Sequence, residues 1–434
     1  MKKTLSAIQW MAFIILGNVV YALAVGPMFH MTEPQIMMFL QRSIFILGVG
    51  AIIQLFFGHK LYISEVPSGL WFGVFIIYAG IGQSLFGSDI NAIRVLTFSM
   101  IATGVVIAGL SICGLLDKMM FLFSPRVLAT FMILLVAELS KDFIGGMMGL
   151  GYLGRTKISI PILIVSVLLV LLALFIRRFK SISAVSFIII IVVGWGAYYL
   201  LGLTTTMPKF HGFVNLPKPF PFGLPMVSWS MIPTIIIAMF ILLSTMLASM
   251  NVIKEVLERA NERKFETSVK NAGVMLGLAQ VLAGVFFSIG AVPAISIVGF
   301  IEQTNSTKKI PFLIGNILVI IVSLITPIMA FFTTLPTPVA YAAIFTIFAN
   351  MFGVAVKELD KIKDKSKIYF SLGIPIFTGI GIMFIPGAAF SNMPTYASSF
   401  LSNGLVVGIA LAIVIEVYDL IGNKLKEKKL NRGI

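Results

Sequence analysis

Two short stretches, Tyr62-Ile63-Ser64-Glu65-Val66-Pro67-Ser68-Gly69 and Ser288-Ile289-Gly290-Ala291-Val292-Pro293-Ala294-Ile295-Ser296, interrupt an otherwise apolar chain. Each combines glycine and proline with β-branched residues and then runs into another apolar segment. In membrane transporters built from repeats, paired Gly/Pro-interrupted segments are the best sequence pointer to the substrate site. The two stretches therefore predict a transporter with a binding site near the middle of the membrane.

Composition supports an all-α polytopic membrane protein. The chain has 434 residues, of which 59% are hydrophobic and 11% charged, whereas soluble domains carry about 25% charged residues. Apolar segments of about 20 residues, each long enough to cross the hydrocarbon core, recur from end to end. The fourteen predicted spans are residues 6–29, 35–57, 63–84, 91–115, 120–147, 158–177, 182–203, 228–253, 267–288, 290–304, 310–332, 334–355, 367–389 and 402–423.

The placement of basic residues predicts the orientation. With both termini in the cytoplasm, 24 of the 32 Lys and Arg residues fall inside, 4 fall outside and 4 lie within or at the ends of spans. This asymmetry obeys the positive-inside rule. We therefore expect a multi-pass protein of a bacterial cell membrane, with the lipid bilayer as partner and no nucleic-acid partner despite a net charge of +15.

The spans divide into two sets of seven. The predicted domains are a first repeat at 1–203, an extracytoplasmic connector at 204–227, a second repeat at 228–423 and a basic cytoplasmic tail at 424–434. An odd number of spans per half gives the halves opposite orientations, as in an inverted-topology repeat. The single cysteine, Cys113, excludes an intrachain disulfide.

Four segments carry a family resemblance: Ile8-Gln9-Trp10-Met11, Leu122-Phe123-Ser124-Pro125, Leu335-Pro336-Thr337-Pro338-Val339, and Ala283 to Phe300. In these the chain resembles the nucleobase:cation symporter-2 family, the xanthine/uracil permeases, as a divergent member similar to purine permeases. The resemblance implies core and gate domains, with spans three and ten each formed by a short strand followed by a half-helix. It also implies a secondary transporter of nucleobases, and no enzyme, that works by elevator-type alternating access.

The resemblance also implies which residues bind substrate. Leu70 takes the position of the family's stacking aromatic residue, and Trp71 or Phe72 could supply the stacking face instead or simply pack against neighbours. Thr245 and Ser296 stand where the family usually has glutamates. The candidate substrate-binding residues are Ser68, Gly69, Leu70, Trp71, Phe72, Ser244, Thr245, Ser249, Ala294, Ile295 and Ser296.

The hydroxyls at the two glutamate positions change the expected chemistry. Hydroxyls can hydrogen-bond a neutral base but cannot carry a proton near neutral pH. The alternative role for these hydroxyls is to join helices or to bond to carbonyls of their own helix. Glu65 in the first break is the candidate proton carrier, because an intramembrane carboxylate is costly and functional by default. The alternative for Glu65 is a solvated residue at the cytoplasmic mouth. Glu138, Lys141 and Asp142 are spaced to form a structural pair along one helix.

Other functions remain open at this level. The alternatives are an anion transporter of the sulfate-permease-like fold, an uncoupled facilitator and a non-transporting membrane protein. The sequence contains no phosphate-binding loop and no His/Cys cluster, so we expect no metal and no cofactor other than a co-transported proton. The substrate partner is a small nucleobase, and a homodimer stays open.

Overall fold

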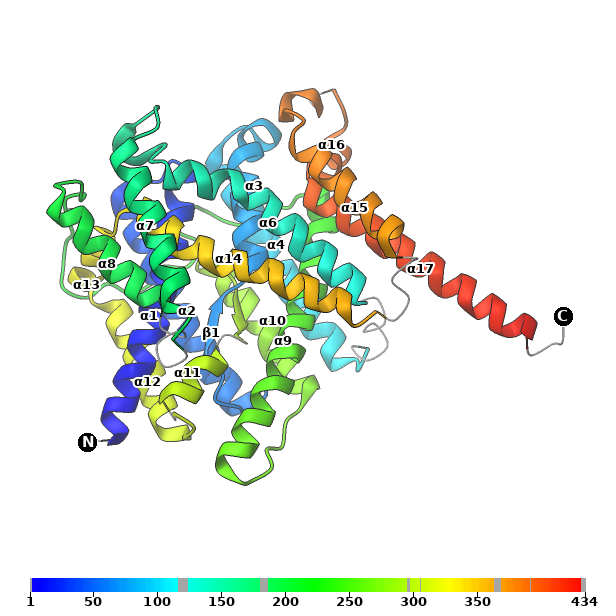
Figure 1. Ribbon diagram of the computed structural model, residues 1–434, viewed down its shortest axis with the longest axis horizontal. Helices are drawn as coiled ribbons and strands as arrows, with labels where there is room; N and C mark the ends of the chain where they lie inside the picture. Colours follow the sequence, from blue (N-terminus) through cyan, green and yellow to red (C-terminus); the bar gives the residue numbers. More distant parts are fainter. Residues whose placement is uncertain are drawn as a thin grey trace.

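The computed structural model describes residues 2–115, 124–179, 186–294, 297–304, 306–362, 368–390 and 392–430 (Figure 1). The chain is mostly helical, with one two-stranded sheet. The elements are α1 (Lys2–Met28), α2 (Glu33–Phe57), β1 (Glu65–Pro67), α3 (Gly69–Phe86), α4 (Asp89–Ile112), α6 (Pro125–Met147), α7 (Ile160–Ile176), α8 (Ser186–Leu200), α9 (Ile232–Asn261), α10 (Val269–Val285), β2 (Ala291–Pro293), α11 (Ile297–Thr304), α12 (Lys309–Leu324), α13 (Thr326–Phe332), α14 (Thr337–Asp360), α15 (Ile368–Met383), α16 (Thr395–Leu401) and α17 (Gly404–Leu430).

Local sequence signals explain where the helices begin. Ser68, Ser88, Ser124 and Ser268 precede α3, α4, α6 and α10, and each side chain accepts a hydrogen bond from a backbone N–H of the first turn. This satisfies one of the donors that a helix start leaves unpaired. Proline also favours a helix start, because the first turn has no use for the N–H that proline lacks. It occurs in the first turn of α2, α6, α7, α9, α13 and α14.

Helical structure lies in every predicted span, with two differences in detail. Among the described residues, five helices are long and apolar enough to cross a membrane, or six if α13 and the start of α14 form one span bent by 75°. In the eleventh predicted span the helix breaks at Ile325, which forms a β-bridge with Val214 of the connector. In the third, α3 has 18 residues and is about 27 Å long, which exceeds the half-helix that the resemblance implied.

The two interrupted stretches pair with each other. β1 and β2 are antiparallel, with Val66 opposite Val292 in the middle of the register. The hydrogen bonds Ser68 N–H to Gly290 O (2.7 Å) and Ala294 N–H to Ser64 O (3.2 Å) extend the pair at both ends. Segments from the two halves of the chain thus meet at the centre of the molecule.

The strand prolines, Pro67 and Pro293, lie at positions where the hydrogen-bond ladder uses no N–H donor. The two end bonds identify Glu65/Pro293 and Pro67/Ala291 as non-hydrogen-bonded pairs, whose backbone groups point away from the partner strand. Proline lacks the N–H donor, so it is tolerated at these positions and not at the central pair. The outward carbonyls of β2 must find partners elsewhere.

Glycines allow close packing at two places in the core. A Cβ added to Gly104 of α4 would lie 2.4 Å from the Gly277 carbonyl of α10, and the reverse distance is 2.5 Å. A Cβ on Gly290 would lie 2.3 Å from the Trp71 ring. Small residues therefore set both the α4–α10 packing and the approach of the β2 segment to α3.

Side-chain contacts define two ends of the molecule. At one end, Ser6 contacts Ser306 (2.7 Å) and Arg263 contacts Tyr62 (2.7 Å). At the other end, the connector is held by Arg94, whose Nε donates to the Leu224 carbonyl (2.8 Å). Helix α12 begins at Lys309, close to Ser306, and its Leu324 carbonyl accepts a hydrogen bond from Asn215 of the connector (3.1 Å), so the N-terminus and the connector lie at opposite ends of α12.

A partly buried set of ion pairs joins two helices far apart in sequence. Arg126, at the start of α6, contacts Asp419 (2.6 Å) and Glu416 (3.5 Å) of α17. The side chain of Arg126 is only 11% exposed. The pair attaches the long α17 helix, which projects from the rest of the molecule in Figure 1.

Candidate functional site

The strand pair and the start of α3 form the centre of the candidate site, which we call the strand-pair site. Ser68 is buried and its hydroxyl accepts from the Trp71 N–H (3.4 Å), so it caps α3. A Cβ built on Gly69 meets nothing within 4 Å, so this first residue of α3 borders open space. Because a helix N-terminus carries partial positive charge and unpaired N–H groups, this edge suits the carbonyl oxygens of a polar ligand.

Trp71 is held by a buried amide rather than left free to stack. Its Nε1–H donates to Oε1 of Gln280 on α10 (2.9 Å), and Nε2 of Gln280 donates to the Ala291 carbonyl (2.6 Å). Both side chains are fully buried. Gln280 thus satisfies one outward carbonyl of β2 and fixes α3 against that strand.

The three predicted hydroxyls of α9 have different surroundings. Ser249 donates to the Pro293 carbonyl (2.7 Å), the second outward carbonyl of β2, and is fully buried. Thr245 donates to the Ile241 carbonyl of its own helix (2.8 Å). Ser244 is buried, and among the described residues its hydroxyl has no hydrogen-bond partner. The structure therefore brings Ser249 to the strand pair, while Ser244 keeps an unused hydroxyl.

Glu65 lies inside the protein, within β1. It is fully buried, and no hydrogen-bond partner reaches either carboxylate oxygen among the described residues. A Cβ added to Gly50 of α2 would lie 3.3 Å from the Cγ of Glu65, so the Glu65 side chain faces α2. Successive strand residues point to opposite faces, which places Val66, half-buried, on the other side. Glu65 is therefore not the solvated loop residue of the alternative interpretation.

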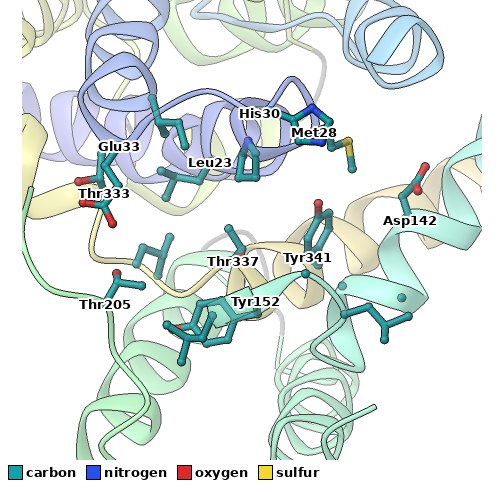
Figure 2. Close-up of a pocket in the computed structure, with 18 of the residues that line it drawn as sticks. Leu23, Met28, His30, Glu33, Asp142, Tyr152, Thr205, Thr333, Thr337 and Tyr341 are labelled. Atoms are coloured by element: carbon teal, nitrogen blue, oxygen red, sulfur yellow. The ribbon is translucent and has the colours of Figure 1, made fainter. Parts of the chain in front are cut away.

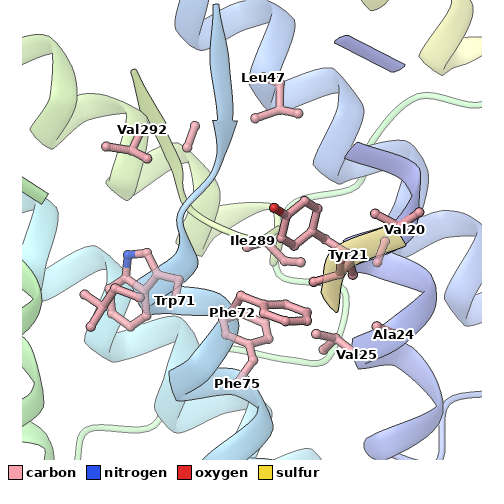
Figure 3. Close-up of a cluster of buried hydrophobic side chains, with 14 of the residues drawn as sticks. Val20, Tyr21, Ala24, Val25, Leu47, Trp71, Phe72, Phe75, Ile289 and Val292 are labelled. Atoms are coloured by element: carbon pink, nitrogen blue, oxygen red, sulfur yellow. The ribbon is translucent and has the colours of Figure 1, made fainter. Parts of the chain in front are cut away.

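An aromatic row runs from the strand-pair site toward the connector end. The Tyr21 ring of α1 meets Phe72 edge-on at 5.1 Å (Figure 3). Phe72 stacks with Phe143 of α6 at 6.1 Å, and Phe143 lies 6.1 Å from Tyr341 of α14. Phe72 thus packs between aromatic rings of two other helices, α1 and α6.

A cavity of about 630 Å³ lies beyond this row (Figure 2). Leu23, Met28 and His30, from α1 and the turn after it, form one wall, and Thr337 and Tyr341 of α14 contribute to the other. The hydroxyl of Tyr341 donates to the Ala24 carbonyl of α1 (3.3 Å), so it bridges the two sides. The cavity is large enough for a small heterocycle.

A second cavity of about 800 Å³ shares Met28, Lys141 and Asp142 with the first. Glu138 also lines this second cavity. Among the described residues, no ion pair within 4 Å joins Lys141 to either carboxylate. The three charged residues of α6 therefore border cavities rather than forming the expected structural pair.

The remaining predicted residues are placed as follows. Leu70 is buried in α3, and Ala294 is buried with its N–H bonded to the Ser64 carbonyl (3.2 Å). Ile295 and Ser296 lie outside the described residues, as does the end of the tail at 431–434. Among the described residues, no group of three His, Cys, Asp or Glu side chains could hold a metal ion.

Sequence reasoning missed Gln280, Tyr21 and Tyr341. An amide within an apolar span is a recognisable signal, because polar side chains at membrane depth usually bind another helix. Tyr341 follows the Leu335–Val339 motif by two residues. Nothing in the sequence distinguishes Tyr21 from other aromatic residues of the first span.

The comparisons with known proteins agree with this picture. A family model for xanthine/uracil permeases, described as the Permease family, matches residues 1–388. The chain is 34% identical over 426 residues to the "Putative purine permease YwdJ" of Bacillus subtilis (strain 168), covering 97% of this chain and 96% of that protein. It is 24% identical to the xanthine permease of the same organism, covering 98% and 95%.

Solved structures show the same fold at low identity. The transmembrane domain of the cyanobacterial bicarbonate transporter BicA superposes with a TM-score of 0.64 at 14% identity, over 88% of this chain and 97% of that domain. SLC26A9 superposes with a TM-score of 0.64 at 13% identity, over 96% of this chain and 65% of that protein.

Proposed function

This chain belongs to the xanthine/uracil permease family, and we propose that it transports purine bases across the membrane. The observation that carries the proposal is the pairing of β1 with β2 beside the open N-terminus of α3. The family's relatives are transporters, so the chain is a multi-pass membrane protein and not an enzyme.

We propose that the base binds at the strand-pair site. A nucleobase is flat and carries N–H donors and carbonyl acceptors along its edge. Gly69 leaves room at the start of α3, whose N–H groups suit base carbonyls. The unused hydroxyl of Ser244 and the partly exposed Val66 face supply further polar and apolar contacts.

We further propose fourteen spans in two inverted repeats, with both termini in the cytoplasm and an elevator-type movement. The antiparallel pairing of segments from the two halves is the contact expected of an inverted repeat. The aromatic row and the two cavities lie between α1 and α3 on one side and α6 and α14 on the other, so this is the plane along which the core would move against the gate. Small local shifts of side chains cannot expose one binding site to both sides of the membrane in turn, so the core would move against the gate as a rigid body.

The transport test uses the reconstituted protein. Uptake of labelled hypoxanthine, guanine, xanthine, uric acid and uracil is measured in proteoliposomes, with empty vesicles as control. Saturable uptake of at least one purine, with little uptake of uracil, is the expected result. The absence of uptake for every base would overturn the proposal.

We propose that Glu65 carries the coupled proton. It is an unpaired intramembrane carboxyl in the strand pair of the proposed binding site. Thr245 and Ser296, whose hydroxyls cannot carry a proton near neutral pH, stand at the two family glutamate positions. Glu65→Gln should abolish accumulation driven by a pH gradient and keep downhill uptake. Glu255→Gln, whose side chain is 73% exposed, serves as the matched control. Gradient-driven accumulation by Glu65→Gln equal to that of the control would eliminate Glu65 as the carrier.

A further inference from the structure

A basic cavity of about 530 Å³ lies at the N-terminal end of the molecule, away from the strand-pair site. The segment between α2 and β1, the loop between α9 and α10, and the start of α12 form it. Its cationic side chains are Lys60, Arg263, Lys264 and Lys309, and Glu266 is its only carboxylate among the lining residues. The transport function proposed above makes no use of this cavity.

The cations are not neutralised by the protein. Among the described residues, no ion pair involves any of these four cations. Instead, Arg263 donates to the Tyr62 hydroxyl (2.7 Å) and lies over the Phe265 ring at 4.7 Å. Lys309 lies over the Phe56 ring at 4.8 Å. These contacts orient the cations and leave their charge available to an anion.

Buried aromatic rings and a helix start form the floor of the cavity. The Tyr62 ring meets Phe265 edge-on at 5.6 Å, and both residues are buried. Lys60 adopts a left-handed backbone conformation with φ of 62°, which is uncommon for a residue with a side chain. Helix α12 begins at Lys309, and no side chain caps its first N–H groups. A helix start with free N–H groups adds a second preference for an anion at this place.

The rim of the cavity is apolar. Phe56 and Phe57, the last residues of α2, are 41% and 65% exposed. Phe56 lines the cavity, and exposed apolar rings at the end of a membrane helix suit contact with lipid chains. A ligand that combines a phosphate group with an acyl chain satisfies both the cations and this rim.

We propose that this cavity binds the phosphate group of an anionic phospholipid. The phosphodiester would contact Lys60, Lys264 and Lys309, and the acyl chains would extend along Phe56 and Phe57. Since the cavity includes the residues that lead directly into β1, an occupied cavity would attach the core to the lipid headgroup layer. A soluble phosphate compound shares the same chemistry and is the competing source of the ligand.

The test measures lipid binding without any transport, so its outcome is independent of base uptake. The full chain is purified in detergent, phosphatidylglycerol is added, and retained lipid is measured by native mass spectrometry. Lys60→Gln, Lys264→Gln and Lys309→Gln are combined in one variant, and Arg263 is kept because it holds Tyr62. The matched control combines Lys254→Gln, Lys270→Gln and Lys357→Gln, which remove three charges outside the cavity.

Loss of three cations should weaken phosphatidylglycerol binding about 100-fold, while the control variant should bind like the unmodified chain. Unmodified and cavity variants should melt within about 1 °C of each other, because all three lysines are exposed. Equal retention of phosphatidylglycerol by the cavity and control variants would overturn the proposal. Displacement of the lipid by glycerol phosphate or inorganic phosphate at equal concentration would assign the cavity to soluble phosphate compounds and overturn the lipid assignment.

Discussion

Gln280 should be the side chain on which the geometry of the strand pair most depends. Gln280→Leu removes the bond from Trp71 Nε1 (2.9 Å) and the bond to the Ala291 carbonyl (2.6 Å). Both partners, Trp71 and Ala291, are fully buried. Leaving a buried polar group unpaired costs about 1–3 kcal/mol, so the two together cost about 2–6 kcal/mol.

This cost converts into a measurable shift. At about 2 cal/mol/K of unfolding entropy per residue, a chain of 434 residues shifts its melting temperature by about 1 °C per kcal/mol. Gln280→Leu should therefore melt about 2–6 °C lower in detergent, measured by intrinsic fluorescence. Gln83→Leu makes the same chemical change at an exposed position of α3 and should melt within about 1 °C of the unmodified chain.

A double-mutant cycle separates the hydrogen bond from the packing. Trp71→Phe keeps an aromatic ring but leaves Gln280 Oε1 without its donor. Because the double variant loses the shared bond only once, its destabilisation should be smaller than the sum of the two single variants by about 1–3 kcal/mol. Equal melting of Gln280→Leu and Gln83→Leu, or strictly additive losses in the cycle, would refute the assignment of Trp71 and Gln280 as one structural unit.

Three further predictions follow from single contacts. Ser249→Ala should lower both the melting temperature and the base affinity, because the Pro293 carbonyl of β2 loses its hydrogen-bond donor. Thr245→Val should change the melting temperature little, because Thr245 bonds only to its own helix. Equal effects of the two variants in thermal melts and binding assays would contradict this. Arg126→Gln should lower the free energy of unfolding by about 1–3 kcal/mol, which is less than for a fully buried pair because its partner Asp419 is 42% exposed. Arg259→Gln, which removes an exposed ion pair, should leave the melting temperature unchanged. Burial lowers the pKa of His59 to about 3, so below about pH 6.5 only the unfolded chain takes up the proton and stability falls by about 2 kcal/mol at pH 5. His59→Gln should flatten the melting temperature between pH 7 and 5, and an unchanged pH slope would contradict it.

Local signals in the sequence were sufficient for the class of protein and for the two segments that form the strand pair. Apolar length and charge placement depend only on how each segment partitions between lipid and water, so helices lie in all the predicted spans. The two Pro/Gly breaks mark where a continuous helix cannot form, and both lie in the strand pair. The family resemblance is confirmed by the match over residues 1–388.

The roles of individual side chains depended on which segments meet. The antiparallel register turns the carbonyls of Ala291 and Pro293 outward, and this makes Gln280 and Ser249 structural partners of β2. No local pattern contains this information, because residue spacing does not specify the strand partner.

The sequence by itself determined that this chain is a membrane protein with two interrupted segments, since hydropathy and proline act over a few neighbouring residues. Only the tertiary structure decided that Glu65 is buried without a partner, because a glycine of α2 lets the strand approach closely there. It also gathered Lys60 and Lys264 from two loops and Lys309 from the start of α12 into one cavity. Burial and charge clustering arise from long-range packing, which the order of residues along the chain does not display.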